Sequence, residues 1–233
     1  MKLAIIGDGK MGQALAPLAT ARGHAVTAML GLAENRDGSG IDPARLGHPD
    51  VAIEFTEPGS AVANALACVR IGLPVVVGTT GWYDRLPEVT SEVRRANGAM
   101  FVAPNFSLGV AVMVAAAQAA AAAARALTAF DVHLVETHHA AKKDRPSGTA
   151  ASIADIAGQA LDRDVPITSV RTGHVPGTHE LILDAPFEQV RIVHEARDRR
   201  VFADGAISAA EWLLGRTGVF TMRDLLQQPE DGR

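Results

Sequence analysis

The N-terminal segment, residues 1–21, constrains the fold more than any other part of the chain. An apolar run at residues 2–6 is followed by Gly7-Asp8-Gly9-Lys10-Met11-Gly12, which matches G-x-G-x-x-G, and then by a helical period up to Ala21. Strand, glycine turn and helix thus occur in the order of a dinucleotide-binding unit. Gly7 permits the tight turn, Gly9 lets a pyrophosphate approach the backbone, and Gly12 lets helix and strand pack closely. The segment predicts dinucleotide binding, with an ordinary glycine turn as the alternative.

The position that separates NADH from NADPH is ambiguous. In such units an acidic residue about 20 residues after the glycine turn binds the ribose. Here the second strand, residues 24–30, is followed by Gly31-Leu32-Ala33, with Glu34 slightly later and Arg36 beyond it. Either Glu34 binds the adenosine ribose and Arg36 a 2′-phosphate, or both are solvated loop charges. The predicted cofactor is therefore NADPH or NADH, with the preference open.

Strand–helix alternation continues downstream. Residues 51–56 and 74–78 have the pattern of strands, with an alanine-rich helix near residues 60–70 between them. This alternation predicts an α/β fold with a Rossmann-like, doubly wound parallel sheet, in which the ligand lies outside the carboxyl ends of the strands. Small residues with hydroxyl groups at Gly78-Thr79-Thr80-Gly81 suit a nicotinamide amide and ribose, although a glycine-bounded turn is the alternative. Besides Glu34 and Arg36, the expected cofactor-binding residues are Gly7, Gly9, Lys10, Met11, Gly12, Phe55, Gly78, Thr79, Thr80, Pro104, Asn105 and Phe106.

Charge and cysteine content exclude several classes of protein. The 233 residues carry a net charge of −4, so there is no global basic field and nucleic acid is not an expected partner. Cys68 is the single cysteine, which excludes an internal disulfide framework and indicates a reducing cytoplasm. The alanine-dominated stretch 111–124 is too short and too weakly hydrophobic for a membrane span. Met1-Lys2 leads directly into a strand pattern, which leaves no room for a signal peptide.

Catalytic chemistry is predicted in residues 136–150, Glu-Thr-His-His-Ala-Ala-Lys-Lys-Asp-Arg-Pro-Ser-Gly-Thr-Ala. The segment follows a strand-like stretch at residues 130–135 and precedes an alanine-rich helical pattern. Pro146, Ser147 and Thr149 are typical of a helix start, which offers backbone N–H groups and the positive end of the helix dipole. Two histidines and two lysines add positive charge. The segment therefore predicts a site for a small dianion.

The pattern then changes to strands, at residues 167–171, 179–183 and 189–196. Their alternation predicts an open mixed sheet with one face against helices and the other covered by a neighbouring subunit. Residues 1–105 and 200–233 are predicted to form the dinucleotide-binding domain. Residues 106–199 are predicted to form a second α+β domain for substrate binding and oligomerisation.

Taken together, the motifs resemble those of the 4-hydroxy-tetrahydrodipicolinate reductase family, also called dihydrodipicolinate reductase. The most specific is His-His-x-x-Lys-x-Asp-x-Pro-Ser-Gly-Thr-Ala, present without a gap from His138 to Ala150. The resemblance implies NAD(P)H-dependent hydride reduction of a cyclic dicarboxylate to tetrahydrodipicolinate in lysine and diaminopimelate biosynthesis, by a cytoplasmic homotetramer. The supporting motifs, in chain order, are residues 5–12, 55–56, 78–81, 104–107, 138–149 and 201–206.

The same resemblance implies a role for individual residues. His138 corresponds to the family's acid/base histidine and Lys142 to its catalytic lysine, and an imidazole suits proton transfer near neutral pH. Which of the two delivers the proton stays open, as does the hydroxylated or dehydrated state of the ring. Arg199 aligns with a family arginine near the substrate, with surface charge as the alternative. The residues matched to substrate carboxylates are His139, Lys142, Ser147, Gly148 and Thr149.

Two other functions are compatible with parts of the sequence. An aspartate dehydrogenase-like enzyme could share the glycine turn, but it would not need the Pro146–Thr149 turn for a second carboxylate. A non-catalytic nicotinamide-nucleotide sensor would have little reason to keep both His138 and Lys142. No metal is expected, because a third ligand at a suitable spacing is missing and the neighbouring lysines repel a cation.

Overall fold

The computed structural model describes residues 1–227, whose contacts divide them into two compact units. The first unit comprises Met1–Ser107 and the chain from Arg200 onward, and the second comprises Leu108–Arg199. The first segment ends two residues later than the boundary expected from the sequence. The reason is Phe106, whose ring packs 5.9 Å from that of Phe101 and therefore belongs to the first core.

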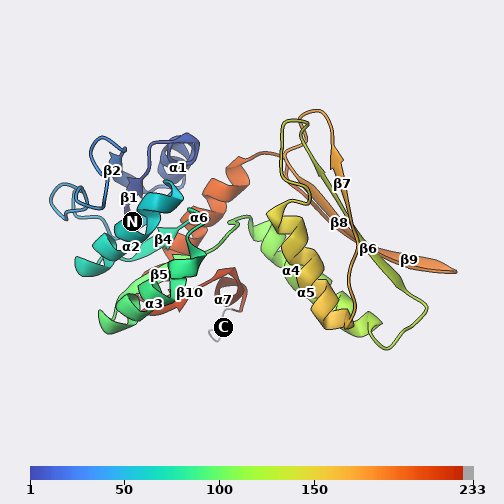
Figure 1. Ribbon diagram of the computed structural model, residues 1–233. Coiled ribbons are helices and arrows are strands. Elements are labelled where there is room, and N and C mark those ends of the chain that lie inside the picture. The colour runs from blue at the N-terminus through green and yellow to red at the C-terminus, as the bar shows by residue number, and fades with distance from the viewer. Residues whose placement is uncertain (228–233) are drawn as a thin grey trace. The chain divides into compact units, whose positions relative to one another are not determined.

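A six-stranded parallel sheet, in the order β10-β5-β4-β3-β1-β2, forms the first unit (Figure 1). Its two faces are buried in separate cores, one beneath α1 and α6 and the other beneath α2 and α3. This is the doubly wound arrangement that the sequence predicted. The strands are β1 (Lys2–Ile6), β2 (Ala25–Leu30), β3 (Val51–Glu54), β4 (Val75–Val77), β5 (Ala99–Val102) and β10 (Gly218–Phe220). The helices are α1 (Lys10–Ala21), α2 (Pro58–Arg70), η1 (Tyr83–Arg85), α3 (Leu86–Arg95), α6 (Arg200–Leu213) and α7 (Met222–Leu226).

The strand order places a topological switch point between β1 and β3. From β1 the chain crosses to β2 on one side, and β3 then pairs with the other side of β1. Ligands of open α/β sheets bind outside the carboxyl ends of the strands at such a point. The loops that begin at Gly7 and Phe55 leave the sheet there. The short strand β10 was not expected, because three half-buried residues give no periodic signal.

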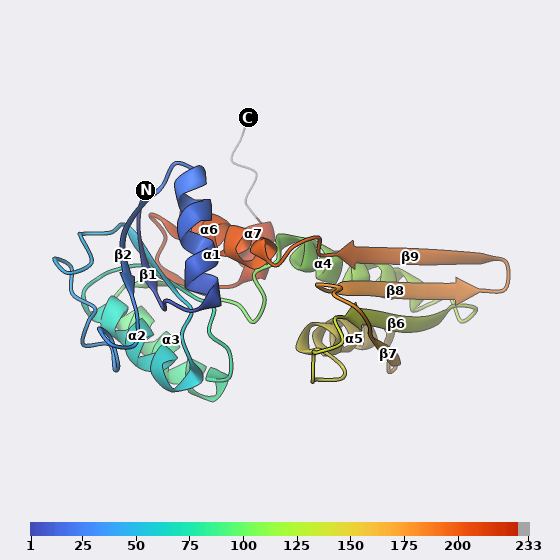
Figure 2. The same cartoon turned by 90° about the horizontal axis from the view of Figure 1, so that it is seen from above.

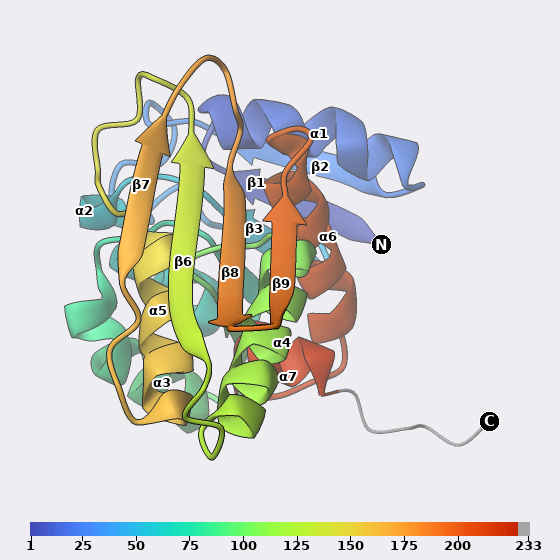
Figure 3. The same cartoon turned by 90° about the vertical axis from the view of Figure 1, so that its right-hand side faces the viewer.

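A four-stranded mixed sheet, in the order β7-β6-β8-β9, forms the second unit. Both helices, α4 (Leu108–Ala124) and α5 (Gly148–Leu161), lie on the same side of this sheet (Figure 3). Strands β8 and β9 form a long antiparallel hairpin beside β6 (Figure 2). The sheet therefore has one face covered by helices and one open face, as predicted. The strands are β6 (Asp131–His138), β7 (Ile167–Arg171), β8 (Thr178–Ala185) and β9 (Glu188–Glu195).

Strand β6 extends further than the sequence pattern suggested. It ends at His138 rather than near residue 135. Since alternate residues of a strand share a face, Val132, Leu134, Glu136 and His138 all face the helices and are all buried. The first two belong to the apolar core. The last two bring a carboxylate and an imidazole beneath the sheet.

No helix within residues 1–227 combines the length and the hydrophobicity that a bilayer span requires.

Candidate active site

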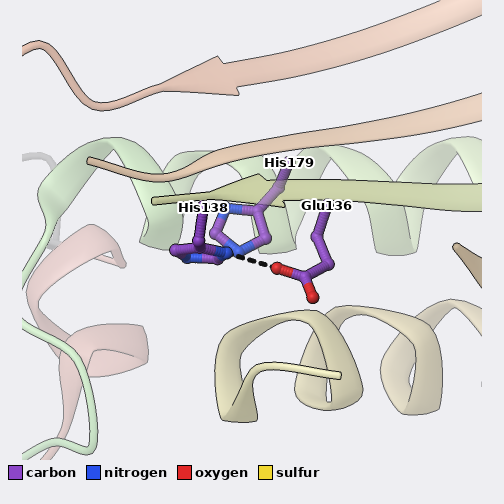
Figure 4. A group of neighbouring side chains, drawn as sticks. All are labelled: Glu136, His138 and His179. Carbon is purple, nitrogen blue, oxygen red and sulfur yellow. Dashed lines mark hydrogen bonds and ion pairs between the residues drawn. The ribbon is translucent and has the colours of Figure 1, made fainter. Parts of the chain in front are cut away.

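The site in the second unit lies where β6 ends beside the start of α5. Strand register brings two further side chains to Glu136 and His138 on the covered face. Parallel pairing places Arg171 of β7 next to His138, and antiparallel pairing places His179 of β8 opposite Glu136. Figure 4 shows the two β6 side chains with His179 beside them. Ser147, the N-cap of α5, lies 3.5 Å from His179 (Oγ to Nε2).

Glu136 is the centre of this group. Arg171 donates from Nη2 to its Oε1 at 2.6 Å, and His138 donates from Nδ1 to its Oε2. Both the carboxylate and the guanidinium are almost inaccessible to solvent. Burial acts to raise the pKa of Glu136, but the hydrogen bonds from Arg171, Ser169 and His138 outweigh it and lower the pKa to about 2. Glu136 is therefore ionised at any pH at which the protein is expected to work.

The two buried histidines are neutral near pH 7. Burial lowers the pKa of His138, and the opposing effect of Glu136 does not restore it. Burial, assisted by repulsion from His138 and His194, lowers the pKa of His179 to about 4. The rings of His138 and His179 meet edge to face with centroids 5.3 Å apart. A neutral imidazole can accept or donate a proton after a small change in its surroundings, as acid/base catalysis requires.

The loop between β6 and α5 carries a lysine, Lys142, whose charge acts on both His138 and His179. Lys142 pairs with Asp144, Nζ to Oδ1 at 2.8 Å, and its side chain is 25% exposed. The hydrogen bond from Lys142 lowers the pKa of Asp144. Arg171 also donates to the carbonyl of Asp144 at 2.5 Å, which ties the loop to β7. The ammonium group is thus held near the histidines while it keeps access to solvent.

The residues expected to hold the substrate are placed as follows. The Ser147 side chain accepts a hydrogen bond from the Ala150 amide at 3.1 Å and so caps α5, whose first turn begins with exposed Gly148 and half-buried Thr149. His139 is half-buried at the end of β6, and its carbonyl accepts from the Lys142 amide at 3.1 Å. Arg199 is exposed between β9 and α6, and its place in the substrate site stays a prediction.

Sequence reasoning missed Glu136, Arg171 and His179. Glu136 could have been recognised from the sequence, because it continues the alternation of Val132 and Leu134 and stands two residues before His138. Arg171 and His179 join the group only through the pairing of β7 and β8 with β6. Pairing register is not encoded in local spacing, so the sequence alone gave no signal for them.

The covered face also holds a group with metal-ligand chemistry. Ligand atoms of Glu136, His138 and His179 lie within 4.8 Å of one another. His179 is the third ligand that the sequence did not show. However, Arg171 occupies one oxygen of Glu136, and His138 already donates to the other. A cation at this position would have to displace the hydrogen bond to His138 beside a buried guanidinium.

The glycine turn of the first unit has the shape of a pyrophosphate cradle. Gly7 has a φ of 113°, and a Cβ there would lie 2.0 Å from the Phe55 carbonyl oxygen. A Cβ on Gly12 would lie 2.0 Å from the carbonyl oxygen of Gly7, so only glycine lets helix and strand approach this closely. Gly9 caps α1, and a Cβ there would meet nothing within 4 Å. The start of α1 is thus open to an anion. Lys10 beside it is exposed and Met11 packs on the core.

The loops after β3, β4 and β5 form the rest of the expected cofactor rim. A Cβ on Gly78 would lie 2.1 Å from the Phe55 ring, so this glycine makes room for the aromatic side chain. The Thr79 hydroxyl accepts from the Thr56 amide at 2.7 Å. The side chain of Phe106 is 2% exposed and belongs to the core, which leaves only its backbone for a ligand. At the surface, Thr80 and Pro104 are exposed and Asn105 is half-buried.

The loop after β2 holds the two residues that bear on cofactor preference. Glu34 accepts from the Gly31 amide at 3.0 Å, so its carboxylate turns back to its own loop. Both Glu34 and Arg36 are exposed.

A buried carboxyl group that the sequence did not single out organises this rim. Glu54, at the end of β3, is fully buried and accepts hydrogen bonds from the Thr56 hydroxyl and, at 3.3 Å, from the Asn64 amide. Burial raises its pKa. Asn64 in turn accepts from Asn35 at 2.8 Å, which connects β3 to the loop after β2.

Comparison with known proteins identifies both parts of the chain. The family described as dihydrodipicolinate reductase, N-terminus, matches residues 1–106, and that described as dihydrodipicolinate reductase, C-terminus, matches residues 109–226. A 4-hydroxy-tetrahydrodipicolinate reductase of Christiangramia forsetii is 36% identical over 97% of this chain and 98% of its own. The protein of that name from Methanoculleus marisnigri is 36% identical over 76% of each chain.

The fold has a counterpart among solved structures. A dihydrodipicolinate reductase from Paenisporosarcina sp. TG-14, with dipicolinate bound, superimposes with a TM-score of 0.80. The match covers 95% of this chain and 97% of the other at 22% sequence identity. This likeness supports the two-sheet architecture.

Proposed function

The chain belongs to the dihydrodipicolinate reductase family, and we propose that it reduces 4-hydroxy-tetrahydrodipicolinate to tetrahydrodipicolinate with NADH or NADPH, in lysine and diaminopimelate biosynthesis. The observation that carries the proposal is the buried group of His138, Glu136 and Arg171, together with Lys142 in the loop that leads from β6 to α5. It lies in the part of the chain that matches the family's C-terminal half. The proposed compartment is the cytoplasm, since the single cysteine, Cys68, is buried and free.

We assign cofactor binding to the first unit. The open N-terminus of α1 at Gly9 suits the pyrophosphate, because backbone N–H groups and the helix dipole both favour an anion. The loops at Phe55, Gly78 and Thr80 would orient the nicotinamide end at the switch point. The bound cofactor would supply a hydride, and the work of these residues is to hold it and to exclude water.

We assign substrate binding to the second unit. The substrate of the family's reaction is a small ring with two carboxylates, and this unit offers two kinds of anion-binding group. Lys142 supplies an ammonium, and Ser147, Gly148 and Thr149 form the first turn of α5, with its positive dipole end. We propose that His139 and Arg199 also bind the substrate carboxylates.

We assign the proton step to His138, with Lys142 as the alternative donor. Hydride addition builds negative charge on the ring, which a proton must neutralise. His138 is buried and hydrogen-bonded to Glu136, and burial lowers its pKa, so the neutral ring can exchange a proton. Even if Lys142 keeps its proton, its positive charge stabilises the negative charge that develops on the ring.

We further propose that the open face of the second sheet is the surface through which the chain forms a homotetramer. Val135, Ile182 and Val193 lie on this face, and Val193 is 55% exposed. Glu180 pairs with both Val135 and Val193, and Ile182 is the next residue of β8 on the same face. Apolar residues on an uncovered sheet face favour a second copy as the cover.

The assignment predicts that the purified protein consumes NADPH or NADH only when substrate is present. The substrate can be generated in place from pyruvate and aspartate semialdehyde by a synthase, and the reaction followed by the loss of reduced-nicotinamide absorbance. Cofactor binding without consumption would contradict the reductase and favour a nucleotide sensor. Consumption of the oxidised cofactor with aspartate instead would favour an amino-acid dehydrogenase.

His138→Ala and Lys142→Ala are each expected to lower kcat by about 10²–10⁴-fold, the usual scale for a positioned acid/base group. The Kd for NADPH should stay nearly unchanged, because neither residue belongs to the unit assigned to the cofactor. Lys143→Ala is the matched control, since Lys143 is an exposed lysine of the same loop. Full turnover in either test variant would remove that residue from the mechanism.

Arg36→Ala is expected to weaken NADPH binding about 10-fold or more while leaving NADH nearly unaffected, if the guanidinium meets the 2′-phosphate. Fluorescence titration with each reduced cofactor measures both Kd values. Arg70→Ala serves as the control, because Arg70 is an exposed arginine at the C-terminal end of α2, away from the carboxyl ends of the strands. Equal losses for the two cofactors would show that Arg36 is a loop charge without selectivity.

Val193→Glu is expected to convert the tetramer to a smaller species, because it buries a charge between sheets that pack face to face. Light scattering coupled to size exclusion measures the mass of each species. Leu127→Glu introduces the same charge at another exposed apolar residue of this unit, after α4. Loss of the tetramer in both variants alike, or in neither, would contradict the assignment of the open face.

A further inference from the structure

Glu136 is a buried carboxylate next to the proposed proton-transfer residue, yet it is not among the residues assigned to substrate or cofactor. We propose that Glu136 is a positioning residue. Held by Arg171, it fixes the His138 ring with the proton on Nδ1, so that Nε2 is the nitrogen that exchanges a proton with the substrate. The inference rests on the proposed function, in which His138 takes part in the proton step.

The first support is the geometry of the carboxylate. Arg171 Nη2 donates to its Oε1 and His138 Nδ1 donates to its Oε2, while Ser169 is a further hydrogen-bond partner of the carboxylate. The side chain of Arg171 is 1% exposed and is also bound to the Asp144 carbonyl. The guanidinium thus anchors one oxygen, and the orientation of the other oxygen is fixed with it.

The second support is the placement of the imidazole hydrogen. An ionised carboxylate can only accept hydrogen bonds, so Nδ1 of His138 must carry the hydrogen. The lone pair of the neutral ring, or the transferable proton of the imidazolium, is then on Nε2. That nitrogen lies beside Gly177, where an added Cβ would be only 3.0 Å away. The glycine keeps side-chain atoms away from the reactive edge of the ring.

The third support is the balance of charge around His138. Glu136 is on its own strand, Arg171 on β7, His179 on β8 and Lys142 in the following loop, while α4 carries no charged residue. Burial lowers the pKa of His138, and Lys142 and Arg171 add to that effect. The Glu136 carboxylate raises the pKa of His138 and so lowers the free-energy cost of forming the imidazolium. Without it, the ring would lose its proton at a lower pH.

Glu136→Gln tests the proposal because an amide cannot accept at both ends. Arg171 is always a donor, so it should take the amide oxygen, which leaves the NH₂ group facing His138. Nδ1 must then accept, and the hydrogen of the neutral ring moves to Nε2. We expect kcat to fall by about 10²–10⁴-fold, with the descending limb of its pH profile moved to lower pH and the cofactor Kd unchanged.

The tautomer can be measured directly by two-dimensional ¹⁵N–¹H NMR of the histidine ring of the full-length protein. The unmodified protein should show His138 with hydrogen on Nδ1, a result that requires no variant to fold. Glu180→Gln is the matched control, because Glu180 is a carboxylate on β8 that pairs with Arg191, away from the His138 group. This control should leave both the tautomer and kcat unchanged.

The outcomes separate this inference from the proposed function. Hydrogen on Nε2 in the unmodified protein overturns the inference whatever the activity. Full turnover in Glu136→Gln together with a large loss in His138→Ala also overturns it, while the role of His138 stands. Full turnover in both variants overturns the proposed role of His138. If Glu136 acts through His138, adding Glu136→Gln to His138→Ala should lower kcat no further, whereas a general structural defect would add to the loss.

Discussion

The second unit depends on one buried interaction, the carboxylate of Glu136 shared between Arg171 and His138. Removing a partner from such a pair typically costs about 3–5 kcal/mol, because the remaining charge stays in a medium that solvates it poorly. The same guanidinium holds the Asp144 carbonyl, so the pair also orders the loop that carries Lys142. The conformation of this loop and the orientation of the His138 imidazole therefore depend on the same buried carboxylate.

A neutral histidine beside a lysine is the chemical result of this arrangement. Burial withdraws the histidines from water and lowers the pKa of His138 and His179, whereas Lys142 keeps contact with solvent. A neutral imidazole does not repel the ammonium group, so both can serve one small dianion. If His138 were solvated and cationic, its repulsion of Lys142 would oppose their convergence.

Most of the fold could be predicted from the sequence, because each element has a local signal. The glycine turn at residues 7–12, the apolar strands and the alanine-rich α4 are read from spacing and composition. The site was predicted only in part. His138, Lys142 and Ser147 lie in one contiguous segment, whereas Arg171 and His179 come from strands whose register with β6 depends on the whole sheet. The early end predicted for β6 also hid Glu136, since treating residues 136–138 as a loop removes the alternation that pairs it with His138.

Two buried glutamates show how their surroundings set the chemistry of identical groups. Glu136 receives a guanidinium and an imidazole N–H, and its pKa falls to about 2. Glu54 receives donors without charge, from Thr56 and Asn64, and burial raises its pKa. Neutral donors offset only part of the desolvation of a carboxylate, whereas a cation reverses its effect. Glu54 is thus suited to ordering the loops of the cofactor rim, and Glu136 keeps the permanent charge that an acid/base histidine needs beside it.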